Sequence, residues 1–158
     1  MAAVTAYNIS VWIHVTAVVV GFGATFAEAM MFPVAMKLDE RHLPYVHRLG
    51  VAINRRLANP ALLVIVITGI YQVAKGDWSF GAFWISATFA IAIALGALLG
   101  SYFIPTDKKL AVMAEKDLAA GGLSDEYRRL ARREGQIGTV AGILIVVAIF
   151  LMVTKPGA

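Results

Sequence analysis

Residues 78–104 read WSFGAFWISATFAIAIALGALLGSYFI and contain no charged side chain. A helix needs roughly 20 apolar residues to cross about 30 Å of hydrocarbon, because its backbone polar groups must be satisfied within the segment. Three further stretches of this kind occur at about residues 7–36, 57–74 and 135–154. The sequence therefore predicts an all-α polytopic membrane protein, built as a bundle of four transmembrane helices.

The composition also indicates that lipid is the solvent for much of the surface. Hydrophobic residues make up 59% of the 158 residues, charged residues make up 15%, and the mean hydropathy is +0.75. Soluble domains are nearer to about half apolar and a quarter charged. We expect one membrane domain over residues 1–158. The absence of cysteine excludes disulfides, thiolate metal sites, iron–sulfur clusters and covalently attached c-type haem.

The basic residues are distributed very unevenly between the connections. Twelve of the 14 Lys and Arg residues fall in the connections 37–56 and 105–134, which leaves only Lys75 and Lys155 elsewhere. The positive-inside rule places both of these connections in the cytoplasm and both termini outside. The net charge of +4 is therefore a topology signal, and we expect membrane lipids rather than nucleic acid as its partner.

The cytoplasmic connections contain signals for short helical extensions. Thr106 or Asp107 could cap a helix that stops at the pair Gly121-Gly122, and Ser124 could begin a helix that leads into the fourth span. In the second span, Pro60 either lies in the first turn or kinks a longer helix that begins near Pro44.

Small residues indicate where the helices approach one another. Without a hydrophobic drive between them, helices in lipid associate by close backbone contact at such positions. These positions would also suit a homodimer through glycine-rich helix faces. They are Gly21 and Gly23 in the first span, Ala92, Gly96 and Gly100 in the third, and Gly138 and Gly142 in the fourth.

His14, Gly21 and Glu28 share one stripe of the first helix, because they are spaced by seven residues. An ionised side chain at the centre of a span costs about 2.5–3.5 kcal/mol, so His14 and Glu28 should face the interior of the bundle. About 20 Å of helix separates them, which places them in different layers. Gly21 would let a neighbouring backbone or a flat ligand approach between them.

The layer of His14 is a candidate for binding a cofactor. An imidazole, aromatic rings and a thioether around one cavity would suit haem or a copper ion. Alternatively, His14 forms a hydrogen bond with a Thr or Tyr across the bundle. The side chains expected at its depth are Thr68, Tyr71, Trp84, Thr88 and Met152.

Glu28 lies near the cytoplasmic end of its span, where basic residues are close. We expect an ion pair with Arg55 or Arg56, or otherwise a protonated carboxyl group that relays protons.

Several Met and His residues gather at the first cytoplasmic junction. They do not favour a copper site, because consecutive Met side chains point about 100° apart, and Met serves more often as filler. The residues are Met30, Met31, Met36, His42 and His47.

The chain also resembles a family over nearly its whole length. The segments that carry the resemblance are Trp12-Ile13-His14, Arg55-Arg56-Leu57, Asn59-Pro60-Ala61-Leu62, Thr68-Gly69 and Leu151-Met152-Val153-Thr154-Lys155-Pro156. They resemble small bacterial membrane proteins grouped with the copper-resistance D-like superfamily. This resemblance implies a place in the bacterial cytoplasmic (inner) membrane.

That superfamily includes haem-binding protoporphyrinogen oxidase J-type proteins, in which a first-helix His is a haem ligand. The resemblance therefore implies haem b at His14. No other span contains His, so a second ligand would be Met152, Lys155, water or a group from a second chain.

Three functions remain open from the sequence. The first is a redox or electron-transfer role with haem at His14, and the second is copper or small-solute transport with Glu28 and His14 lining a path. The third is a non-catalytic membrane scaffold. No Gly-rich phosphate loop, nucleophile elbow or paired-His metalloprotease motif occurs. Hydrolase and kinase activities are therefore not expected, and whether the protein is an enzyme stays open.

Overall fold

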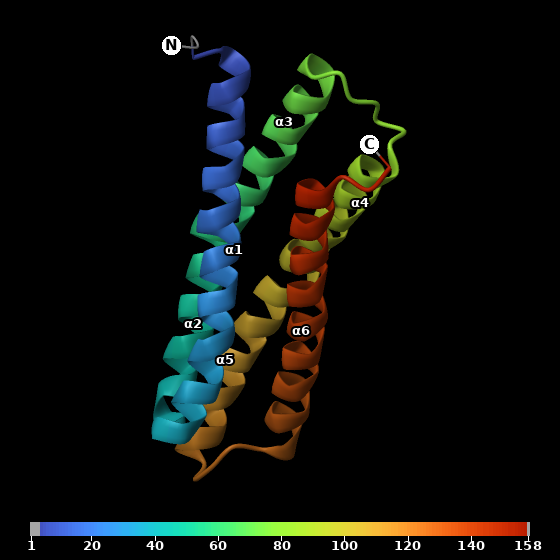
Figure 1. Cartoon of the computed structure of the whole chain (residues 1–158). Helices are drawn as coiled ribbons and strands as arrows, with labels where there is room; N and C mark the ends of the chain where they lie inside the picture. Colours follow the sequence, from blue (N-terminus) through green and yellow to red (C-terminus); the bar gives the residue numbers. More distant parts are fainter. Residues whose placement is uncertain (1–3, 158) are drawn as a thin grey trace.

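The structure is a computed structural model that describes residues 4–157. Within these residues the chain forms four long helical rods that are apolar enough to cross a membrane (Figure 1). This confirms the predicted all-α bundle of four transmembrane helices.

The first rod is a single helix, α1, over Ala6–Leu38. The Thr5 side chain caps its start by accepting a hydrogen bond from the backbone N–H of Asn8. The helix ends at Asp39, which has an extended backbone, and a short 3₁₀ turn, η1 (Glu40–His42), then reverses the chain.

The second rod runs from Glu40 to Lys75. It consists of α2 (Leu43–Ile53), a π-helical turn η2 (Asn54–Ala58) and α3 (Asn59–Lys75). Pro60 lies two residues after the end of the π turn. Proline has no N–H to donate and its ring crowds the preceding turn, so a wider turn accommodates it without ending the helix. Of the two sequence alternatives, the longer helix beginning near Pro44 is the one found.

The third rod has the same design. It consists of α4 (Phe83–Leu98), a π turn η3 (Leu99–Phe103) and α5 (Ile104–Ala119), and Pro105 again comes after the π turn. The prediction that Thr106 or Asp107 caps a new helix is wrong, because the rod continues through this point and buries Asp107.

The turn after α5 uses glycine backbone conformations. Gly121 and Gly122 adopt φ values of 106° and 158°, which side-chain-bearing residues rarely adopt. The fourth rod, α6 (Asp125–Thr154), then begins at Ser124, whose hydroxyl accepts from the N–H of Tyr127, as predicted.

Both termini lie at one end of the bundle, and the two basic connections lie at the other (Figure 1). All four rods expose large apolar side chains on their outer surfaces, for example Val19, Leu63, Ile93 and Phe150. A surface of this kind is suited to lipid, and a bundle embedded in a bilayer requires it on every rod.

The rods pack unequally along their length. Near the basic connections, α1, α2, α5 and α6 enclose a core that includes the fully buried side chains of Leu43, Leu110 and Tyr127. Toward the termini, α1 packs closely on α3 while α4 packs on α6. At the first of these contacts, a Cβ on Gly21 would lie 2.6 Å from the Cβ of Ala61. Gly21 therefore admits a neighbouring helix rather than a flat ligand.

Candidate functional site

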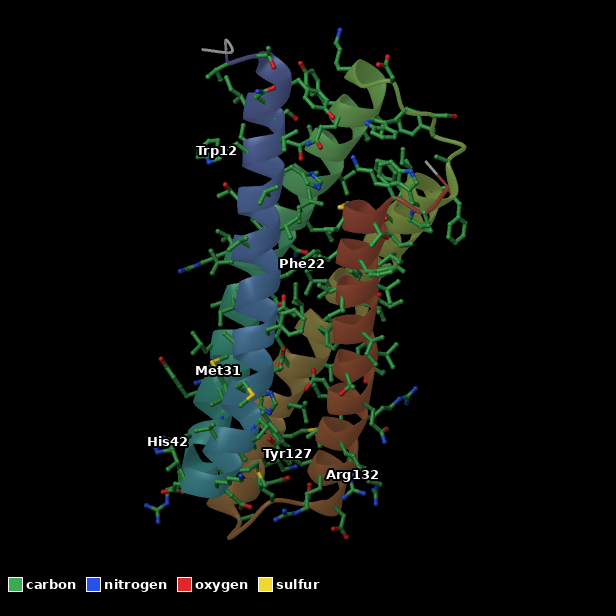
Figure 2. The ribbon with its side chains drawn as sticks, viewed as in Figure 1. Trp12, Phe22, Met31, His42, Tyr127 and Arg132 are labelled. Carbon is green, nitrogen blue, oxygen red and sulfur yellow. The ribbon has the colours of Figure 1, made fainter. Side chains whose placement is uncertain are left out.

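A cavity of about 730 Å³ lies between the rods. Its walls are mostly apolar, and its lining includes Phe22 and Phe26 of α1, Phe103 of η3, and Leu95 of α4. Phe22, in the middle of α1, points toward the interior of the bundle. Trp12, nearer the N-terminal end of the same helix, points outward (Figure 2). The polar side chains of the lining gather toward the end near the basic connections: Glu28, His47, Asn54, Asp107 and Glu134.

His47 of α2 is the centre of this polar group. Its Nδ1 lies 2.8 Å from Oδ1 of Asp107 on α5, and its Nε2 lies 2.9 Å from the hydroxyl oxygen of Tyr127 on α6. All three residues are buried, with exposed fractions of 4%, 7% and 1%. When Nδ1–H donates to the carboxylate, Nε2 accepts from the tyrosine hydroxyl. The imidazole thus joins three of the four rods.

A second carboxyl group, that of Glu28, approaches from α1. Its Oε1 accepts a hydrogen bond of 3.1 Å from the Asn54 amide. A Cβ built on Gly50 would lie 2.5 Å from Oε1 of Glu28 and 3.3 Å from Oδ2 of Asp107. The missing side chain of Gly50 is therefore what lets two carboxyl groups approach each other here.

Glu134 of α6 completes the group. Its Oε1 is buried and has no hydrogen-bond partner among residues 4–157. Three possible metal-ligand atoms lie within 4.8 Å of one another here, one each from His47, Asp107 and Glu134. We refer to His47, Asp107, Glu134 and Glu28 as the inner cluster. Tyr127 lies just beyond it, between the rods, whereas Arg132 on the same helix points away from the bundle (Figure 2).

The inner cluster lacks a basic side chain to balance its carboxyl groups. The predicted ion pair of Glu28 with Arg55 or Arg56 is wrong, since both arginines are exposed and Glu28 bonds to Asn54. Asn54 takes the inward position, so the next two residues point about 100° and 200° away from it on the helix. Within residues 4–157, the Lys and Arg ion pairs lie at the surface, for example Arg48 with Glu115.

His14 lies outside this site. Its Nδ1 is 2.8 Å from the hydroxyl of Thr68, which itself donates to the backbone carbonyl of Val64. The hydroxyl therefore accepts from Nδ1–H, and this sets the orientation of the ring. Gly69 leaves room for the imidazole, because its Cβ position is 3.7 Å from Cε1 of His14. The predicted hydrogen bond of His14 to a Thr across the bundle is therefore present.

The other residues expected in the layer of His14 lie in less polar surroundings. Trp84 packs in a buried cluster with Val73 and Leu151, beside the ring of Trp78. Tyr71 and Met152 are partly buried. Among the described residues, the cavity lining reaches Gly21 on α1 and does not include His14.

Three members of the inner cluster were not expected from the sequence to form a site: His47, Asp107 and Glu134. For His47 and Glu134, the sequence does contain a helical pattern of buried residues. Leu43, His47, Gly50 and Asn54 form one buried face of the second rod, and their spacing of three to four residues is that of a helix stripe. Tyr127, Ala131 and Glu134 repeat this pattern on α6. Which of these helix faces meet in the folded bundle cannot be predicted from the sequence pattern.

The chain is similar to a known family over almost its whole length. A family model described as a predicted integral membrane protein (DUF2269) matches residues 8–156. No curated protein and no solved structure matches the chain.

Proposed function

The chain belongs to this family of integral membrane proteins, and we propose that it binds a divalent first-row metal ion at the inner cluster and passes it through the membrane. The observation that carries the proposal is the convergence of His47, Asp107 and Glu134 from three rods, with ligand atoms within 4.8 Å of one another. Among the functions open from the sequence, this is closest to copper or small-solute transport, with the site at the inner cluster instead of at His14 and with a metal other than copper.

Electrostatics favours a cation at this position. Three carboxyl groups in an apolar surrounding are costly unless they are neutralised by protons or by a bound cation. The one imidazole nearby is already bonded to Asp107 and Tyr127, and the Oε1 of Glu134 has no partner. A metal ion would satisfy the unpaired oxygen and balance the charge at once.

The chemistry of the side chains limits the kind of metal. One nitrogen and several carboxylate oxygens suit Zn²⁺, Mn²⁺ or Fe²⁺, whereas Cu⁺ prefers thiolate and thioether ligands. The chain has no cysteine. His47 would exchange one of its two present hydrogen bonds for the metal, and the remaining partner would hold the ring in place.

The surroundings of the inner cluster support passage rather than simple storage. The cavity extends from the cluster toward Gly21 and Ile65, in the middle of the spans. On the other side, Leu43, Leu110 and Tyr127 are fully buried and close the route toward the basic connections. The inner cluster is therefore closed toward the basic connections, and we infer that passage of an ion requires the rods to open on that side.

Metal analysis and calorimetry of the purified protein test the binding. We expect one Zn²⁺ or Mn²⁺ per chain. Glu134→Gln should weaken binding by more than the roughly 10- to 100-fold that loss of an outer-shell partner produces. Glu126→Gln on the same helix is the matched control, since Glu126 is exposed and pairs with Lys109. Absence of bound metal in the wild type, or equal loss in both variants, would refute the proposal.

Passage needs its own test in proteoliposomes that contain a metal-sensitive dye. We expect the wild type and Glu126→Gln to take up the ion, and Glu134→Gln not to. Binding without uptake by the wild type would restrict the proposal to metal storage.

Haem at His14 is the second candidate, and one observation favours it. The Nδ1 of His14 is held by Thr68, which is how ligating histidines are commonly oriented so that Nε2 can face a metal. The residues proposed around the haem are Tyr71, Trp84 and Met152. The prediction is a Soret band that His14→Ala abolishes and Thr68→Val shifts. Colourless protein from haem-replete cells would remove this candidate.

The remaining expectations stay proposals. We place the protein in the bacterial inner membrane with both termini outside and with lipids as its surroundings. A homodimer would use glycines that stay open, such as Gly23 and Gly100, since Gly21 and Gly96 meet neighbouring helices of the same chain. A non-catalytic scaffold would predict that substitutions at the inner cluster change stability only.

A further inference from the structure

The cavity is larger and more apolar than a metal ion requires. Pockets for small organic ligands measure about 300–1,000 Å³, and this cavity measures about 730 Å³. Four phenylalanine rings line it, namely Phe22, Phe26, Phe32 and Phe103. Cavities of this size and lining bind drug-sized organic molecules.

The mouth of the cavity faces the lipid. Among its lining residues, Phe26 on α1 is 44% exposed, and Ile143 and Val146 on α6 are 58% and 56% exposed. These side chains are apolar and belong to the outer surfaces of α1 and α6. A molecule that enters here therefore comes from the hydrocarbon and can leave an apolar tail in it.

The polar end of the cavity accepts hydrogen bonds, and the described residues that line it include no Lys or Arg. Glu28, Asp107 and Glu134 present carboxyl oxygens, and the Asn54 amide already donates to Glu28. The buried Oε1 of Glu134 has no partner. Ionised carboxyl groups repel a phosphate headgroup, and their oxygens accept hydrogen bonds from hydroxyl groups. A phospholipid is thus a poor occupant, and a head that carries O–H donors is a good one.

We propose that this cavity binds a membrane-soluble amphiphile of the quinol class. Its hydroxylated aromatic ring packs among the phenylalanine rings, one hydroxyl donates to Oε1 of Glu134, and the apolar tail leaves between α1 and α6. The proposal concerns binding only. It shares Oε1 of Glu134 with the metal proposal, so quinol and metal ion would compete for this atom. The phenylalanine walls and the mouth between α1 and α6 serve the quinol alone.

The test compares decylubiquinol with decylubiquinone on wild-type protein in nanodiscs, with native mass spectrometry and thermal shift as readouts. The two probes share ring and tail, but only the quinol has hydroxyl donors. We expect one bound quinol per chain and about tenfold weaker binding of the quinone, because the quinone leaves Glu134 without a donor. Equal binding of both probes, binding of neither, or a retained phospholipid that neither displaces would overturn the proposal.

Two variants locate the bound probe. Gly142 lines the cavity, and its Cβ position is 3.6 Å from the Phe26 ring, so Gly142→Leu fills the space beside the mouth. We expect it to lose quinol binding while keeping metal binding. Val153→Leu is the control, because Val153 is 75% exposed and does not line the cavity among the described residues. Quinol binding that survives Gly142→Leu in folded protein would place the probe elsewhere and refute the proposal.

Discussion

His47 and Asp107 lie 60 residues apart in the chain and share a buried hydrogen bond of 2.8 Å between Nδ1 and Oδ1. This bond joins the second rod to the third at the level of the cavity. The other ring nitrogen of His47 reaches Tyr127 on the fourth rod. The imidazole is therefore both a structural link and the one nitrogen donor of the inner cluster.

Removing this imidazole should destabilise the bundle. His47→Ala leaves the carboxyl group of Asp107 and the hydroxyl of Tyr127 buried without this partner, which we expect to cost about 2–4 kcal/mol. Thermal unfolding in detergent measures the change. His42→Ala is the control, because His42 is exposed, and it should lie within about 0.5 kcal/mol of the wild type. Equal effects of the two substitutions would contradict the assigned role.

Gly50 is needed for the approach of the two carboxyl groups. A Cβ at this position would lie 2.5 Å from Oε1 of Glu28, so Gly50→Ala should destabilise the protein by about 1–3 kcal/mol. In a Glu28→Ala background the 2.5 Å contact is gone and the 3.3 Å approach to Oδ2 of Asp107 remains, so the same substitution should cost less. A double-mutant cycle measures this coupling. An additive cycle would show that Glu28 does not occupy this space.

Gly21 sets the distance between α1 and α3. Gly21→Ala should destabilise the bundle by about 1–3 kcal/mol, because its Cβ would lie 2.6 Å from that of Ala61. Ala61→Gly should restore part of the loss by removing the opposing methyl group. Gly23→Ala, which meets nothing within 4 Å, should be neutral or slightly stabilising. If Gly21→Ala behaves like Gly23→Ala, the close approach is not present in solution.

The orientation can be measured directly, because the chain has no cysteine to remove. Ser79 and Ala120 are exposed at opposite ends of the bundle, so single cysteines there report the two sides. We expect a membrane-impermeant maleimide to label Ser79→Cys on intact cells and Ala120→Cys only after permeabilisation. The reverse pattern would place the basic connections outside.

The four spans, and the presence of both basic connections at one end of the bundle, could be predicted from the sequence. The reason is that a segment inside lipid must be almost entirely apolar. A charge-free run such as residues 78–104 has few other stable environments, and the basic residues gather in two connections. The helix start at Ser124 was also predictable, since its capping chemistry is local. Each of these features depends on neighbouring residues only.

The inner cluster could not be predicted in the same way. The pairing of Glu28 with Arg55 or Arg56 was argued from depth alone, whereas Asn54 takes the inward position and both arginines are exposed. On the third rod, a π turn also precedes Asp107. An extra residue in a turn rotates the rest of the helix by about 100°. The predicted partner of Glu28 was therefore wrong, because its hydrogen-bond partner is Asn54. The pairing of His47 with Asp107 depends on packing between rods, which no local pattern encodes.

X-ray absorption spectroscopy of the Zn²⁺-loaded protein observes the ligands of the bound metal themselves. We predict a first shell of nitrogen and oxygen only, with multiple-scattering features of a single imidazole that disappear in His47→Gln. A protein that binds no Zn²⁺, or a first shell that contains sulfur or keeps its imidazole in His47→Gln, would contradict metal binding at the inner cluster.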